Sequence, residues 1–119
     1  MAKKSKDDII FLDDFCTRIG TKVSKVFTGR DRGEEVRNDS KIDDVYAQYH
    51  HIKVVVPVGT FSITASFLEE FFVNIVLTYG LDTFRETVEI EPNGYEIDEP
   101  FEEAIQRILQ RGNALSKNK

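Results

Sequence analysis

Ser66, Glu69 and Glu70 are the residues whose types and spacing come closest to forming a chemical site. Ser66 lies three residues before Glu69, which is the spacing of a capping box at the start of a helix. A serine there caps free backbone N–H groups, and the same groups together with the helix dipole would stabilise a phosphate on its hydroxyl. The sequence therefore leaves two roles open for Ser66, a plain helix cap and a phosphorylation site.

Other residues with catalytic potential are few. Cys16 is the sole cysteine, and it would need His50 or His51 as a base to act as a nucleophile; otherwise it is a small buried hydrophobe. His50 and His51 are adjacent, so on a strand they point to opposite faces and cannot jointly hold one metal ion. We therefore expect a chain that is not an enzyme and that has no cofactor and no metal site.

A group of acidic residues surrounds the start of the last predicted helix. Carboxylates at a helix start interact favourably with the helix dipole, and the group lacks the loop pattern of a site for a hard cation. We interpret it as electrostatic stabilisation of the helix start; its members are Glu96, Asp98, Glu99, Glu102 and Glu103.

The element that positions Ser66 and the two glutamates is a strand followed by a helix. Residues Ile52–Val58 are rich in β-branched residues, which predicts a strand covered on both faces. The following helix begins at Ser66 and ends at Gly80, a residue that allows the chain to leave a helix with positive φ. A buried strand that leads into a capped helix indicates an α/β domain.

One half of this helix is apolar and predicts the face that packs on the sheet. Val73 and Leu77 fall outside that half, on the side of Glu69 and Glu70, where they would be either exposed as a partner site or covered by another element such as the chain near Val26 and Phe27. We predict a partner-binding surface made of Ser66, Glu69, Glu70, Val73 and Leu77. The predicted core face consists of Phe67, Leu68, Phe71, Phe72, Ile75, Val76 and Tyr79.

The remaining patterns predict the element order β-β-α-β-α-β-α, with a small mixed four-stranded sheet and about three helices. We expect residues 7–112 to form one domain between disordered tails at 1–6 and 113–119, and Phe15–Ile19 fits one helical turn. A helix over Arg32–Tyr49 is weakened at Asn38-Asp39-Ser40. The other predicted elements are strands at Ile9–Leu12, Lys22–Phe27 and Thr87–Glu91 and a helix that has Pro100 near its start and ends at Gly112.

Charge and composition exclude several functional classes. Five basic residues lie in the two tails, and between Asp7 and Leu115 eleven basic residues face twenty-one acidic ones, a net charge of −10. Such an acidic body repels phosphate backbones, so nucleic-acid binding is not expected. The sequence contains no apolar run of about 20 residues and no apolar leader after Met1, so we expect a cytoplasmic protein that does not enter a membrane.

Two further stretches carry a resemblance to a known family. The segment Ser62–Phe72, which includes Ser66-Phe67-Leu68-Glu69-Glu70-Phe71, and the element Arg30-Asp31-Arg32-Gly33 resemble a bacterial and phage STAS-like domain family of unknown function. The segment Tyr79–Phe84, which follows the helix and precedes a strand, is part of the same resemblance. The resemblance extends from about Ile9 to Leu109. It implies a STAS-like fold and a distant similarity to anti-sigma factor antagonists, in which a serine at the position of Ser66 is phosphorylated by a histidine-kinase-type ATPase partner.

Our leading hypothesis is therefore a noncatalytic regulatory module that binds another protein, such as a histidine-kinase-type ATPase or an anti-sigma factor. The alternative is a small-molecule or nucleotide sensor that binds in the crevice near Gly59–Ser66, because open α/β sheets bind ligands at such crevices. Pairing of a free sheet edge with a second copy would produce a homo-oligomer.

Overall fold

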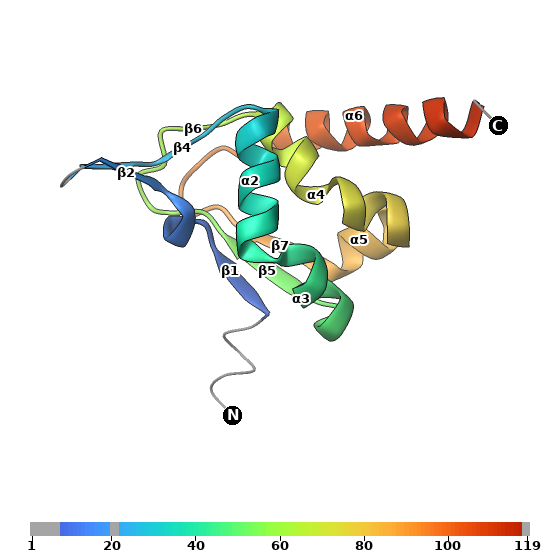
Figure 1. Cartoon of the computed structure of the whole chain (residues 1–119), viewed down its shortest axis with the longest axis horizontal. Coiled ribbons are helices and arrows are strands. Elements are labelled where there is room, and N and C mark those ends of the chain that lie inside the picture. Colours follow the sequence, from blue (N-terminus) through green and yellow to red (C-terminus); the bar gives the residue numbers. More distant parts are fainter. Residues whose placement is uncertain (1–7, 20–21, 118–119) are drawn as a thin grey trace.

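Three short parallel strands form the main sheet, and the chain is α/β as the sequence predicts. The computed structural model describes residues 8–19 and 22–117, so the predicted tail at 1–6 lies outside the described residues. The strands are β1 (Ile9–Phe11), β5 (Ile52–Val55) and β7 (Val88–Glu91), in the order β1-β5-β7. Helices α2 (Arg30–Ser40) and α3 (Ile42–Tyr49) connect β1 to β5, and α4 (Ala65–Tyr79) and α5 (Leu81–Thr87) connect β5 to β7 (Figure 1).

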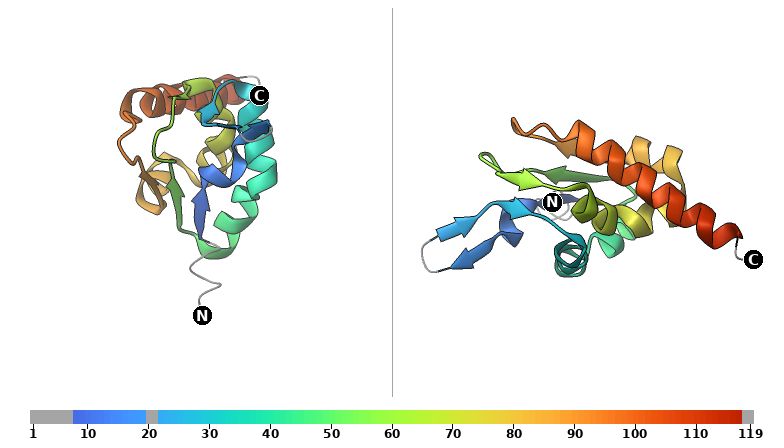
Figure 2. Two further views of the ribbon diagram at one scale, coloured as in Figure 1. Left: turned by 90° about the vertical axis from the view of Figure 1, so that its left-hand side faces the viewer. Right: turned by 90° about the horizontal axis from the view of Figure 1, so that it is seen from above.

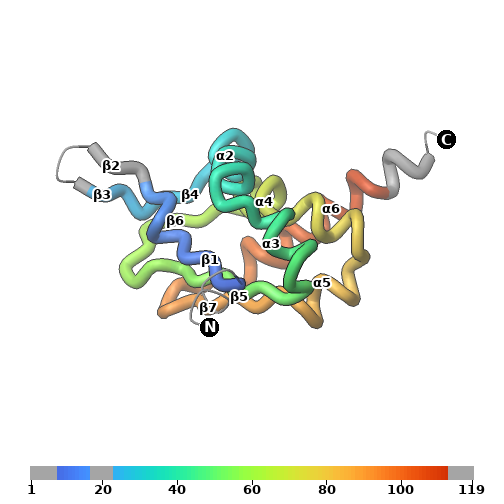
Figure 3. Tube along the Cα trace, turned by 60° about the horizontal axis from the view of Figure 1, so that its bottom comes forward, coloured from blue at the N-terminus to red at the C-terminus, as the bar shows by residue number. Residues whose placement is uncertain are grey.

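The helices pack on one face of this sheet. The register aligns Ile10 with Val54, and both are buried, whereas the neighbouring Phe11 and Lys53 stay accessible. Figure 3 shows the three strands together on one side of the molecule, with α2, α3 and α4 on the other. The prediction that the strand beginning at Ile52 is covered on both faces is therefore wrong, because both connections between the parallel strands cross on the same side.

The other strands form two separate pairs and do not join the main sheet. The hairpin of β2 (Thr17–Ile19) and β3 (Lys22–Ser24) is antiparallel, and β4 (Val26–Phe27) pairs in parallel with β6 (Ser62–Ile63). In the described part of the chain, one four-stranded sheet is thus replaced by a three-stranded sheet and two pairs, and Phe15 belongs to the 3-10 helix η1 (Leu12–Phe15). Figure 1 shows β4 and β6 running side by side into the starts of α2 and α4.

The described residues form five α-helices where about three were predicted, because the predicted helix Arg32–Tyr49 is divided in two and α5 was not predicted. Lys41 has a left-handed backbone (φ +57°) directly after Asn38-Asp39-Ser40, and it separates α2 from α3. Gly80 (φ +93°) ends α4 and starts the short α5. Ile42 and Tyr46 of α3 are buried, so this helix packs on the core through one face.

The last helix, α6 (Asp98–Lys117), has the predicted start but not the predicted end. Pro100 lies in its first turn, where its missing N–H has no helical partner in any case. Ala104, Ile105 and Ile108 are buried in the core. The helix passes through Gly112 and continues to Lys117, so residues 113–117, predicted as part of a disordered tail, are helical.

Helix α4 lies at the centre of the core. It packs against α2 on one side and α6 on the other, and Figure 2 shows α6 crossing over it. Six of the seven residues predicted for its core face are buried, and each buried phenylalanine contributes about 1.5–3 kcal/mol. Tyr79 is the exception, since it is partly exposed and stacks edge-on against Tyr46 at a ring distance of 4.8 Å.

Candidate functional site

The start of α4 is capped by Thr64 and not by Ser66. The helix begins at Ala65, and Thr64, with extended backbone angles, accepts a hydrogen bond from Phe67 N at 3.4 Å. Thr64 Oγ1 also accepts from the backbone N–H of Gly29 at 3.1 Å, which joins the starts of α2 and α4. The capping box predicted for Ser66 is therefore wrong, and the partly buried Ser66 hydroxyl lies 3.1 Å from Thr64 Oγ1 inside the first turn.

Glu69 is fully buried, although the sequence places it on the polar side of α4. Its Oε2 accepts from Arg111 of α6 at 3.1 Å and from Arg30 of α2 at 3.4 Å, and Arg107 of α6 lies 3.9 Å from Oε1. A carboxylate without water needs such partners, because an isolated buried charge is strongly unfavourable. Glu69 thus connects three helices through charge.

Glu70 extends this network on the same side of α4. Its Oε2 accepts from Arg111 at 2.7 Å, and Arg37 of α2 donates to its backbone oxygen and lies 3.4 Å from Oε1. Burial disfavours the charge on Arg111, but the hydrogen bonds to Glu70 and Glu69 outweigh it and raise the pKa of this guanidinium. Gly33 allows α2 to lie close to α4 at this point, since a Cβ there would collide with the Phe67 carbonyl oxygen.

The predicted partner surface is divided by the structure. Val73 is 4 % exposed and belongs to the core, so the expectation that the flank of Glu69 and Val73 is open is wrong for both residues. Leu77 is 41 % exposed, and Ser66 and Glu70 are partly buried. Sequence periodicity placed Val73 correctly on the side of the glutamates. That side lies between α2 and α6, which pack on α4 from distant parts of the chain.

Two apolar side chains before β6 are strongly exposed, and the sequence analysis did not identify them. Phe61 is 82 % exposed and Val58 is 70 % exposed. The loop that carries them is held in place, because Lys25 Nζ donates to Val58 O at 2.8 Å and Phe61 N donates to Lys25 O at 2.9 Å. The available signal was an aromatic residue between Gly59 and a strand start, outside every periodic apolar pattern.

Cys16, the candidate nucleophile, lies against the 3-10 helix η1, and His50, a candidate base, contacts two tyrosine rings. Cys16 is partly buried, and its Sγ lies 3.9 Å from Leu12 O and 3.8 Å from Asp13 Oδ1. The His50 ring contacts Tyr46 and Tyr79, at centroid distances of 6.2 and 6.4 Å. Among the described residues, no group of three or more His, Cys, Asp or Glu side chains could hold a metal ion.

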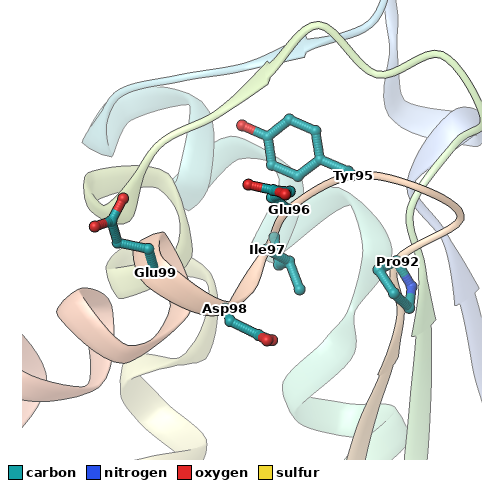
Figure 4. Close-up of a pocket in the computed structure, with 6 residues that line it drawn as sticks. All are labelled: Pro92, Tyr95, Glu96, Ile97, Asp98 and Glu99. Carbon is teal, nitrogen blue, oxygen red and sulfur yellow. The ribbon is translucent and has the colours of Figure 1, made fainter.

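An open hollow of about 570 Å³ lies between the end of β7 and the start of α6. Figure 4 shows Asp98 and Glu99 pointing in opposite directions from the ribbon, so these two carboxylates do not converge. Tyr95 bonds with its hydroxyl to both backbone groups of Ile63, at 2.8 and 3.3 Å, and so supports β6. The lining consists of Pro92, Tyr95, Glu96, Ile97, Asp98 and Glu99.

Comparison of the chain with protein-family models, curated proteins and solved structures gave no match. Within the described residues, none of the helices combines the length and apolar character required to cross a bilayer.

Proposed function

We propose that this chain is a noncatalytic, STAS-like regulatory module that binds another protein at the end of the molecule where α2 and α4 begin. The observation that carries the proposal is the exposure of Phe61 and Val58 on a loop that is fixed by backbone and lysine hydrogen bonds. Exposed aromatic side chains on a rigid support lose little conformational entropy on binding, which is typical of interface anchors. The loop leads directly through β6 to Thr64 and the start of α4.

The parallel strand–helix order and the motif around Ser66 support the STAS-like assignment, and with it a cytoplasmic histidine-kinase-type ATPase or anti-sigma factor as the partner. Phosphorylation of Ser66 would add about −1.5 to −2 charge near Glu69 and Glu70 and would weaken contact with an acidic partner surface. Because the Ser66 hydroxyl bonds within the first turn of α4, phosphorylation also requires that this turn open or that the side chain rotate.

Isothermal titration with the purified ATPase or anti-sigma factor encoded nearest to this chain tests the proposal. We expect binding by the full chain, loss of binding in a Val58→Ser/Phe61→Ser variant, and unchanged binding in a Tyr79→Ser control, since Tyr79 lies at the opposite end of α4. Equal binding by the loop variant and the control would refute the proposed surface. Incubation with the ATPase and ATP, followed by mass spectrometry of a Ser66→Ala variant, tests the modification separately.

A small-molecule or nucleotide sensor is the second candidate. A hollow of about 370 Å³ adjoins the loop and is lined by Gly59, Thr60, Asn93, Gly94, Tyr95 and Glu96. A nucleotide that raises the melting temperature of the full chain, and fails to do so in a Thr60→Val variant, would favour this function over protein binding.

A further inference from the structure

Three partly exposed arginines form a basic patch on an otherwise acidic protein. Arg30 starts α2, and Arg107 and Arg111 lie on α6, yet their side chains all contact Glu69. Their exposed fractions are 61 %, 41 % and 40 %, whereas the Glu69 side chain beneath them is 1 % exposed. We call these three residues the arginine patch.

The buried carboxylates fix the guanidinium groups from below. Arg30 uses only Nη2 toward Glu69, and Arg111 uses only Nη1 for its bonds to both Glu69 and Glu70. Arg107 donates through Nη2 to the exposed Glu103 at 2.6 Å, and its Nη1 lies 3.9 Å from Glu69. A guanidinium has five N–H donors, so in the described part of the chain each of the three arginines retains donors that make no bond within the protein. Guanidinium groups already held in place lose less entropy when they bind a carboxylate than freely moving ones do.

The surroundings of the patch add to its preference for negative charge. Helix α2 starts at Arg30 without a side-chain cap, so its first N–H groups and its dipole present positive charge beside Arg30, which Asp31 in the same turn offsets in part. Gly29 donates to Thr64, which places the start of α4 next to this point. Five of the seven arginines lie on α2 and α6, whereas the chain between Asp7 and Leu115 as a whole has a net charge of −10.

We propose that the arginine patch binds an acidic segment of the partner protein, through carboxylates that bond to the free N–H groups of Arg30, Arg107 and Arg111. This inference rests on the proposed function and specifies the chemistry of the partner: apolar side chains against Phe61 and Val58, and Asp or Glu side chains on the arginine patch. Charge complementarity selects the occupant, because an acidic segment is repelled by most of the remaining surface.

Fluorescence anisotropy with a labelled hexaglutamate peptide tests the patch without knowledge of the partner. We expect the full chain to bind the peptide at low ionic strength, and an Arg30→Gln/Arg107→Gln variant to bind about tenfold more weakly. This variant keeps Arg111 and its bonds to both glutamates. The control Lys53→Gln/Arg85→Gln removes the same charge from exposed ion pairs elsewhere, and it is expected to bind like the wild type.

A lysine variant and competition with inorganic phosphate separate carboxylate binding by the arginine patch from loss of folding and from binding of a small oxyanion. Arg30→Lys/Arg107→Lys retains the charge without the planar fork and should bind with intermediate affinity, which also shows that loss of folding does not explain the weaker binding. Equal weakening in both Gln variants, or no binding by the wild type, would overturn the inference. Displacement of the peptide by an equal concentration of inorganic phosphate would also overturn it, since the patch would then be a site for a small oxyanion.

This assay can fail independently of the proposed function. The hexaglutamate peptide has no apolar side chain, so Val58→Ser/Phe61→Ser should not change its affinity. If the loop variant abolishes partner binding while the arginine variant leaves both assays unchanged, the proposed function stands and the arginine patch is withdrawn.

Discussion

Two groups of ion pairs in this protein have the same chemistry and differ in burial. Arg85 and Glu102 form two hydrogen bonds of 2.8 and 3.0 Å between α5 and α6, and both side chains are about half exposed. The contacts of Glu69 are longer, from 3.1 to 3.9 Å, but its carboxylate is cut off from water. The shorter bonds therefore occur in the exposed pair, Arg85 and Glu102, whose groups can bond to water instead of to each other. The longer contacts involve Glu69, whose buried carboxylate has no water to take the place of its arginines.

Burial rather than distance should therefore decide which group stabilises the fold. An exposed pair exchanges bonds to water for bonds to its partner, with a gain of about 0–1 kcal/mol. A buried carboxylate that loses its partners keeps its desolvation penalty, and breaking such a pair costs about 3–5 kcal/mol. The two groups lie in one domain and share α6, so they can be compared under identical conditions.

Removal of the arginines that α6 contributes to Glu69 should have the largest effect. We expect Arg107→Gln/Arg111→Gln to lower the free energy of unfolding by about 3 kcal/mol, because Glu69 keeps only Arg30. Glu69→Gln should cost less, since it removes the buried charge itself and leaves arginines that water can reach. Urea denaturation of both variants measures the difference. A Glu69→Gln variant less stable than the double arginine variant would contradict this account.

The close contact between α2 and α4 at Gly33 offers a second test, because it holds α2 next to the buried ion pairs of Glu69 and Glu70. Ala normally stabilises a helix relative to Gly by about 0.5–1 kcal/mol, but in Gly33→Ala the new methyl group would meet the Phe67 carbonyl and push α2 away from Glu70. We expect a net loss of about 1–3 kcal/mol, the range for overpacked contacts. Thermal unfolding monitored by circular dichroism measures it.

Gly112→Ala is the matched control. It lies in α6, and its added Cβ would meet only the Leu77 Cδ2 atom at 3.0 Å, at the end of a flexible side chain. This variant should be as stable as the wild type or slightly more stable. Equal destabilisation by both alanines would mean that the backbone contact at Gly33 is not the cause.

Three helical regions and most of the apolar face of α4 could be predicted from the sequence because the signal is local. The phenylalanines of α4 repeat with helical spacing, and Gly80 provides the positive φ at which α4 ends. The choice of Thr64 over Ser66 as the cap could not be predicted, because both are hydroxyl residues within one turn. Only the backbone of Thr64, extended where β6 ends, decides between them.

The site was less predictable because its partners are far apart in the sequence. Glu69 looks like a surface residue from its spacing, and its arginines lie 39 and 42 residues away. No local pattern shows that α2 and α6 both pack on α4 and bring arginines to Glu69. Glu69 looks exposed and is buried, whereas Phe61 looks buried and is exposed. The exposure of Phe61 was missed because an aromatic residue next to a strand is normally assigned to the core.

The exposed pair should give the smallest effect and the clearest dependence on pH. The hydrogen bond from Arg85 lowers the pKa of Glu102, so the pair stabilises the fold above the pKa that Glu102 has in the unfolded chain. This contribution disappears as the pH falls through the lowered pKa, and after allowance for solvent it should not exceed about 0.5 kcal/mol. Carboxyl-carbon NMR titration of Glu102 should show its pKa rise toward the ordinary glutamate value in Arg85→Gln, while urea denaturation at neutral pH changes little. A loss of stability in Arg85→Gln as large as that in Arg107→Gln/Arg111→Gln would show that bond geometry, and not burial, determines the strength of these pairs.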